Sequence, residues 1–296
     1  MSKNAGVFLV LFAAMLWGTT GTAQAFAPSE ANPLIIGALR LAVGGGALLL
    51  FVCLKGKLKK GNWPLLITGI GGISMAAYQP LFFSAVSMSG VAVGTVVAIG
   101  SAPILAGLLE VFIYKKMPKI QWWFATMIGI SGVLLLFNPF QSESFNGVGI
   151  FMAIGAGLSF AVYTLVSKQL LQSQNSEAVV GVIFFLAALL LLPIFFFFPL
   201  QWILEVGGFI TILHLGLLAT ALAYLLFSKG LNDLPASHAV TLSLAEPLTA
   251  ACLGVFLLKE TLTFTNTIGI ALVFMGLILL TVRKRARNEE DVKQVI

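Results

Sequence analysis

The chain carries the same sequence pattern twice, and this repetition limits the folds that it can adopt. Residues 83–136, shifted by 144 positions, align without a gap on residues 227–280. A unit of this length is far longer than the ~20–50 residues of a solenoid repeat, so it indicates two copies of one larger bundle. The aligned pairs are Phe83 with Phe227, Ser84 with Ser228, Ala92 with Ala236, Pro103 with Pro247, Phe112 with Phe256, Lys115 with Lys259 and Gly132 with Gly276; at a shift of 143, Gly6 pairs with Gly149, Phe8 with Phe151 and Trp17-Gly18 with Phe160-Ala161.

The two copies differ at the positions of two charged residues. In the register of 144, Glu246 aligns with Ala102, and Arg40 aligns with Phe184. We expect the shared positions to build the scaffold, and we expect the function to lie where the copies differ.

The composition indicates a membrane protein. Hydrophobic residues make up 59% of the chain and charged residues 9%, and the mean hydropathy is +1.02. A soluble domain needs more charge to cover its surface. Long apolar runs alternate with short polar breaks, which is typical of spanning helices and not of barrel strands. The sequence therefore predicts an all-α integral membrane protein.

The apolar runs divide into ten predicted spans, because a helix needs about 20 residues to cross the hydrocarbon core. We expect one repeat of five spans in residues 1–140, a second in 147–282, and a basic cytoplasmic tail at 283–296. The predicted spans are 5–24, 34–53, 65–88, 92–113, 121–138, 147–166, 178–200, 207–228, 235–257 and 265–282.

The basic residues predict the orientation of these spans. Loops on the side of the N-terminus hold Lys55, Lys57, Lys59, Lys60, Lys115, Lys116, Lys119, Lys168 and Lys229, whereas the opposite loops hold only Lys259. Basic loops remain in the cytoplasm, so both termini are predicted to be cytoplasmic. Five spans per copy is an odd number, which inverts the second copy relative to the first. Inverted repeats place a binding site between the halves and open it to each side in turn.

Several protein classes lack support in the sequence. It contains no GxxxxGK[ST] phosphate-binding sequence, and no aspartate or histidine–glutamate cluster with metal spacing falls in a span. The net charge of +6 lies in loops and the tail, not on a face that could follow nucleic acid. We therefore expect no cofactor, no metal, no nucleic-acid partner and no catalysis.

Arg40 and Glu246 are charged residues inside predicted spans, where an ionisable group costs ~2.5–3.5 kcal/mol. Glu246 is interpreted either as a substrate or proton site or as a structural carboxyl beside Pro247. Arg40 is interpreted either as a clamp on groups of another helix or as a ligand for an anionic substrate; the clamp is favoured. The sequence does not predict that the two pair with each other.

Pro103 and Pro247 occupy equivalent positions, and each removes one backbone hydrogen bond from its helix. Such freed backbone groups are tolerated where they line a cavity. We therefore predict that both prolines border one site, with hydroxyls supplied by Ser101 and Ser243.

Aromatic and amide side chains complete the predicted substrate site. Trp17, Tyr78 and Tyr224 lie within spans and could stack on a ring or a cation, although helix packing is the commoner role of a buried aromatic. Gln79 adds a polar group next to Pro80 in the third span.

In its ordered series of short motifs the chain resembles the drug/metabolite transporter superfamily, in its ten-helix EamA-type branch. The matching residues are Trp17-Gly18, Leu39-Arg40, Pro103, Pro235-Ala236-Ser237, Glu246-Pro247, Lys259-Glu260, Gly269 and Gly276. The resemblance implies a secondary transporter, often an exporter, of amino acids or other small metabolites in a bacterial inner membrane.

The resemblance leaves alternatives open. An importer could use the same fold, and a scaffold subunit would transport nothing; a water-accessible cavity at the repeat interface would separate a transporter from a scaffold. The expected partners are a small-molecule substrate, the lipid bilayer and, as one energy source, a coupled proton carried by Glu246. A monomer and a homodimer are both compatible with the sequence.

Overall fold

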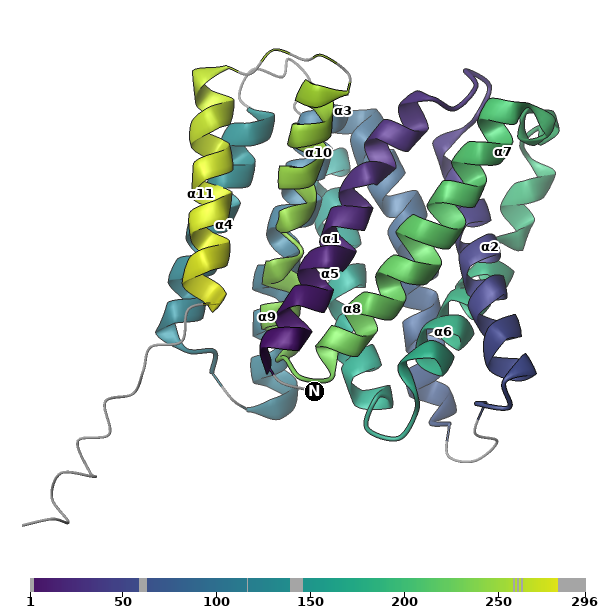
Figure 1. Ribbon diagram of the computed structural model, residues 1–296, viewed down its shortest axis with the longest axis horizontal. Coiled ribbons are helices and arrows are strands. Elements are labelled where there is room, and N and C mark those ends of the chain that lie inside the picture. Colours follow the sequence, from purple (N-terminus) through teal and green to yellow (C-terminus); the bar gives the residue numbers. More distant parts are fainter. Residues whose placement is uncertain are drawn as a thin grey trace, which may run out of the picture.

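The computed structural model describes residues 3–58, 63–115, 117–138, 146–257, 259, 261 and 263–281, and every regular element in them is helical (Figure 1). The predicted tail at 283–296 and the lysines Lys59, Lys60 and Lys116 lie outside these residues. The elements are α1 (Lys3–Ala25), α2 (Pro33–Leu54), α3 (Leu65–Tyr114), α4 (Ile120–Phe137), α5 (Gly147–Leu170), α6 (Ser176–Leu191), η2 (Leu192–Phe196), η3 (Gln201–Leu204), α7 (Val206–Leu213), η4 (His214–Leu222), α8 (Ala223–Leu231), α9 (Ala236–Leu242), α10 (Ala245–Phe256) and α11 (Phe264–Thr281).

The described residues form nine helices long and apolar enough to cross a membrane, and one of these is a double span. α3 has 50 residues, and at about 1.5 Å per residue it would be more than twice as long as the ~30 Å hydrocarbon core. Its backbone breaks at Gly90, whose φ of 79° and ψ of 159° suit glycine. The chain folds back there, because Gly94 lies against the backbone of Val86. The prediction of ten spans is confirmed.

The seventh span ends earlier as an α-helix than predicted. α6 stops at Leu191, and a 3₁₀ segment, η2, continues the span to Phe196. Pro193 lies in the first turn of η2, and proline cannot donate the backbone hydrogen bond that would continue the α-helix. The predicted end at Leu200 was therefore too far along the chain.

α4 of the first copy and α11 of the second copy contact each other through aligned residues. A Cβ on Gly132 of α4 would lie 2.7 Å from the Gly269 carbonyl oxygen of α11, and a Cβ on Gly276 of α11 would lie 2.7 Å from the Ala125 carbonyl oxygen of α4. Residues 132 and 276 are aligned, and so are residues 125 and 269. The small side chains let α4 and α11 approach closely, and the contact is nearly symmetric under exchange of the copies.

We call the face at which α1 begins the N face and the face at which α1 ends the distal face. α3 and α8 end at the N face, and α2 begins at the distal face (Figure 1). The start of α1 and the end of α11 lie on the same side of the bundle in this view, as an even number of spans requires.

Two further spans of the second copy are irregular. The eighth contains a nine-residue π-helix, η4, between α7 and α8. The ninth is interrupted at Ser243 and Leu244, which separate α9 from α10. π segments and broken helices are often found at functional sites. The break at Ser243 borders the cavity, and the π segment bonds to Arg40, which lines it.

Candidate functional site

A cavity of about 430 Å³ lies between the two halves. Both copies contribute to its wall, the first through α1 to α4 and the second through α5, α8, α10 and the break before α10. Eight of the ten predicted site residues line it: Trp17, Arg40, Tyr78, Gln79, Tyr224, Ser243, Glu246 and Pro247. Their part in substrate binding remains a prediction, but the fold brings them together from distant parts of the sequence.

Glu246 lies in the first turn of α10, directly after the break in the ninth span. Its backbone N–H donates to the Ser243 carbonyl oxygen at 2.9 Å. The side chain is half-buried, and its carboxylate forms no ion pair with the described residues. The break thus presents a carboxylate to the cavity without a fixed cationic partner.

Arg40 is buried on α2 and is held by the π segment of the eighth span. Its Nε donates to Thr220 Oγ1 at 2.9 Å, and its Nη2 donates to the Ala219 carbonyl oxygen at 3.0 Å. In the clamp interpretation, Arg40 binds groups of another helix, and these two bonds join Arg40 of α2 to the eighth span. A guanidinium has five N–H donors, so these two bonds leave donors for a ligand in the cavity that Arg40 lines.

Aromatic rings form much of the cavity wall. Trp17 packs edge-on against Phe160 with ring centroids 5.7 Å apart, and it lies 4.6 Å from Tyr224. Tyr78 stacks parallel to Phe82 at 5.8 Å. Rings held in this way can contact the apolar part of a solute while the two charged groups bind its polar part.

Ser101 and Pro103 do not line the cavity. The Ser101 hydroxyl donates to the Ala98 carbonyl oxygen of its own helix at 3.3 Å, and Pro103 is buried inside α3. α3 is continuous through this region, and the neighbouring residues Ile99 and Ala102 face the cavity instead. The prediction that the two aligned prolines border one site is wrong for Pro103.

Sequence reasoning missed several residues of the wall. They include Gln24, Phe82, Phe83, Thr95, Gly157 and Phe160. Phe160 could have been found, because the repeat aligns it with Trp17 and their rings meet at the cavity. The others carry no such signal. Among the described residues, no group of three or more histidine, cysteine, aspartate or glutamate side chains could hold a metal ion.

Comparisons with known proteins agree with this architecture. A profile of the EamA-like transporter family matches twice, at residues 4–138 and 147–282. "Uncharacterized transporter YwfM" of Bacillus subtilis is 48% identical over 98% of both chains. "Threonine/homoserine exporter RhtA" of Escherichia coli K12 is 29% identical over 96% of this chain and 94% of its own.

A solved crystal structure shares the fold, with a TM-score of 0.82 at 22% sequence identity, covering 95% of this chain and 99% of the other. The profile covers both copies, and Trp17 and Glu246 lie within the matched residues. This chain therefore belongs to the EamA-like transporter family.

Proposed function

We propose that the protein is a secondary transporter that exports small zwitterionic metabolites such as amino acids by alternating access. The observation that carries the proposal is one cavity with aromatic walls that holds a buried guanidinium, Arg40, and a carboxylate, Glu246, which forms no ion pair with the described residues. A solute with a carboxylate and an ammonium group complements both charges. The cavity volume of about 430 Å³ falls in the ~300–1,000 Å³ range of small-molecule sites.

The two halves supply the moving parts in this proposal, residues 1–140 rocking against residues 147–282. Inverted repeats support such motion because each half can exchange its conformation with the other. The cavity between the halves favours a transporter over a scaffold subunit, which needs none. Export is favoured over import only by the name of the RhtA relative; catalysis has no support in the family.

We also propose a bacterial inner membrane with both termini in the cytoplasm, so that the N face is the cytoplasmic face. The support comes from bacterial relatives and from the basic side chains near that face. Among the described residues these are Lys55, Lys57, Lys115, Lys119, Lys168 and Lys229, against Lys259 near the distal face.

The test is solute uptake into proteoliposomes that contain the purified protein, with and without a pH gradient. The panel pairs threonine with the amine that lacks its carboxylate and the acid that lacks its ammonium group. We expect transport of threonine alone, because each analogue leaves one buried charge without a partner. Equal transport of all three, or of none across a broad amino-acid panel, would contradict the zwitterion proposal.

Glu246→Gln tests proton coupling in the same assay. If Glu246 carries the proton, the variant loses transport driven by the pH gradient but still exchanges solute at equilibrium. Wild-type accumulation by this variant would reject the coupling role. Tyr224→Phe serves as a control, because it changes the same cavity without removing a charge.

A further inference from the structure

The cavity extends toward one face of the molecule. Its wall includes residues at helix ends on the distal face: Gln24 near the end of α1, Pro33 at the start of α2, Val91 after the break in α3, and Phe137 at the end of α4. The last turn of α3 and the start of α9, which meet at the N face, do not contribute to it. The fourth and ninth spans therefore meet at the N face and are separated by the cavity toward the distal face.

A carboxylate joins the halves at the N face. Glu110, in the last turns of α3, accepts hydrogen bonds from the backbone N–H groups of Ala236 at 3.3 Å and Ser237 at 3.1 Å. These N–H groups begin α9 and have no partner within their own helix. A carboxylate also interacts favourably with the positive end of a helix. The two bonds connect the fourth span directly to the ninth.

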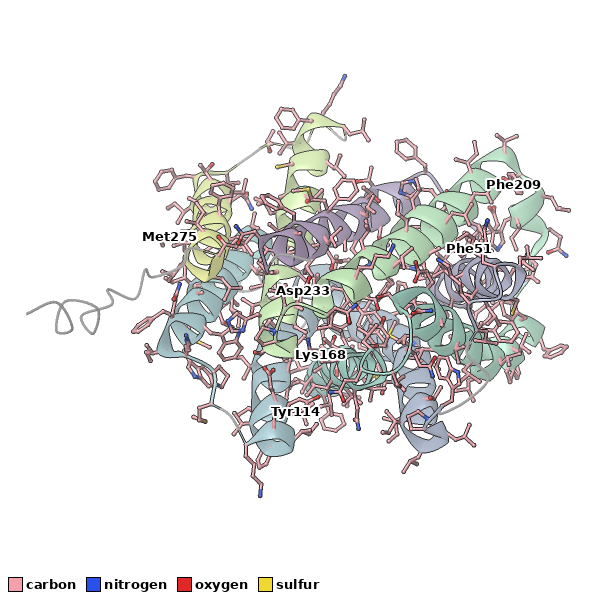
Figure 2. The ribbon with its side chains drawn as sticks, turned by 60° about the horizontal axis from the view of Figure 1, so that its bottom comes forward. Phe51, Tyr114, Lys168, Phe209, Asp233 and Met275 are labelled. Atoms are coloured by element: carbon pink, nitrogen blue, oxygen red, sulfur yellow. The ribbon has the colours of Figure 1, made fainter. Side chains whose placement is uncertain are left out.

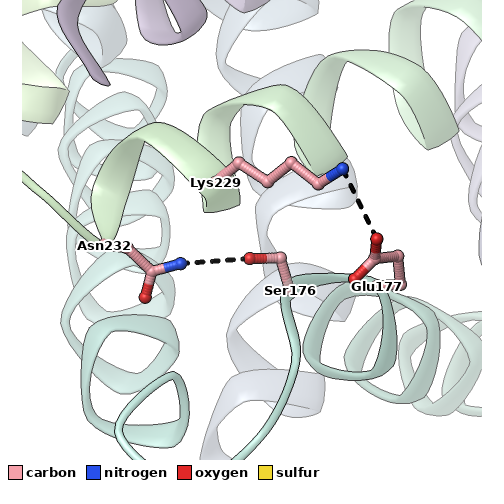
Figure 3. A network of polar contacts seen from close by, with 4 residues as sticks. All are labelled: Ser176, Glu177, Lys229 and Asn232. Atoms are coloured by element: carbon pink, nitrogen blue, oxygen red, sulfur yellow. Dashed lines mark hydrogen bonds and ion pairs between the residues drawn. The ribbon is translucent and has the colours of Figure 1, made fainter. Parts of the chain in front are cut away.

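The end of α8, which leads into α9, is fixed to α5 and α6 of the second half. Lys168 of α5 donates through Nζ to the carbonyl oxygens of Leu231 at 2.6 Å and Asn232 at 2.9 Å. The Asn232 side chain donates to Ser176 Oγ at 3.3 Å, and Lys229 pairs with Glu177 at 3.4 Å (Figure 3). Figure 2, which brings the N face forward, labels Tyr114 at the end of α3, and Lys168 and Asp233 nearby. The bonds of Glu110 therefore join a helix of the first half to a segment held by helices of the second half.

The inverted repeat shows what the distal face lacks. In the register of 144, Glu110 aligns with Gly254, and Ala236 and Ser237 align with Ala92 and Val93. The matching contact at the distal face would join residue 254 to the start of the fourth span. Gly254 has no side chain with which to make it. Among the described residues, the N-face contact of Glu110 therefore has no counterpart at the aligned position of the distal face.

We propose that Glu110 is a latch that holds the N face closed and sets the resting conformation of the protein. The latch acts through its differential contact with the two states, because the bonds to Ala236 and Ser237 are made only when the halves meet at the N face. The proposal depends on the motion of the two halves and not on the identity of the solute, so it can fail while the transport proposal holds.

The test measures distances across both faces by double electron–electron resonance, without solute, in lipid nanodiscs. Spin labels at Met117 and Gln172, both exposed, report on the N face, and labels at Glu30 and Glu205 report on the distal face. The native cysteines Cys53 and Cys252 are exposed and are replaced by serine. Glu110→Ala should shift the ratio of open to closed N face about tenfold, which corresponds to about 1.4 kcal/mol, and should shorten the distal distance.

Two further variants make the result decisive. Glu110→Gln keeps the shape of the side chain but turns one acceptor into a donor facing a backbone N–H, so we expect a smaller shift in the same direction. Glu177→Gln removes a carboxylate of the N face whose ion pair, with Lys229, lies within the second half, and it should leave both distances unchanged. Unchanged distances in folded Glu110→Gln protein, or equal shifts in the Glu110→Gln and Glu177→Gln variants, would overturn the proposal.

Discussion

The fourth and ninth spans are aligned copies that carry proline at the same position, yet they differ in structure. The fourth span is the second part of α3 and stays helical through Pro103. The ninth is interrupted four residues before Pro247, at Ser243 and Leu244. A proline shared by both copies therefore does not by itself decide where a membrane helix breaks.

The side chains around the prolines account for part of this difference. Thr241 Oγ1 accepts a hydrogen bond from Trp122 Nε1 at 2.9 Å and lies 3.0 Å from Thr126 Oγ1, which fixes α9 against α4. The aligned residue of the fourth span is Val97, which has no hydroxyl. The first part of the ninth span is thus attached as a short separate helix, α9, and Glu246 lies in the first turn of the next helix, α10. The comparison teaches that the positions shared by both copies build the scaffold, whereas the cavity carboxylate, Glu246, occurs in the second copy and not at the aligned position of the first.

The largest effect is expected where the copies are most alike. Gly132→Leu and Gly276→Leu each place a side chain against the backbone of the facing helix, 2.6–2.7 Å from its nearest atoms. Overpacking of this kind costs ~1–3 kcal/mol, and more where backbone cannot move. We expect neither variant to give a monodisperse peak in size-exclusion chromatography. Gly46→Leu is the control, because nothing lies within 4 Å of a Cβ built at this position. If the Gly276→Leu variant folds and the Gly132→Leu variant does not, the contact between α4 and α11 is not equivalent in the two copies.

The second prediction moves the carboxylate to the other copy. Glu246→Ala should abolish solute uptake, and adding Ala102→Glu should not restore it. Ala102 lines the same cavity, but it lies in an unbroken helix, so its carboxylate would approach from a different direction. Proteoliposome uptake is the measurement. Recovery of uptake by the double variant would show that the two copies are interchangeable at this position.

The third prediction concerns the attachment of α9. Thr241→Val leaves the buried Trp122 Nε1–H without its acceptor, and an unpaired buried donor costs ~1–3 kcal/mol. We expect lower thermal stability in detergent. The control is Val97→Thr at the aligned position, where the new hydroxyl can bond to a carbonyl of its own helix and stability should change by less than ~1 kcal/mol. Equal losses in both variants would mean that Thr241 has no special part in holding the ninth span.

The smallest effect is expected at the ion pair of the N face. Lys229 and Glu177 lie 3.4 Å apart, with 41% and 15% of their side chains exposed (Figure 3). Exposed pairs contribute ~0–1 kcal/mol. Lys229→Met should therefore lower stability by less than ~1 kcal/mol, and the loss should vanish at high salt. A larger, salt-independent loss would show that this pair holds the second half together.

Much of the scaffold was predictable because it depends on the lengths of apolar runs and on their repetition. The ten spans and the inverted second copy follow from about 20 residues per crossing and an odd number of crossings per copy. The sequence predicted that the chain reverses between residues 88 and 92. The structure shows that the backbone of a single residue, Gly90, makes this reversal. The end of α6 was misplaced, because residues up to Leu200 are apolar but Pro193 stops the α-helical hydrogen bonding.

The candidate site was predictable only in part. Charges such as Arg40 and Glu246 stand out in an apolar sequence because their burial is costly. Ser101 and Pro103 were wrongly placed, since the direction of a side chain depends on the rotation of its helix. The partners of Arg40 were not predictable either, because they lie in a π segment, and its apolar residues resemble those of an ordinary helix.

The sequence alone determined that this protein is a duplicated ten-span membrane protein, since hydrophobic length and repetition are properties of the chain itself. The tertiary structure decided which of the two copies breaks its proline-containing span, which residues face the common cavity, and that Glu110 joins the halves on one face. These features depend on contacts between residues more than a hundred positions apart, such as Glu110 with Ala236 and Arg40 with Thr220. Only packing brings such residues together.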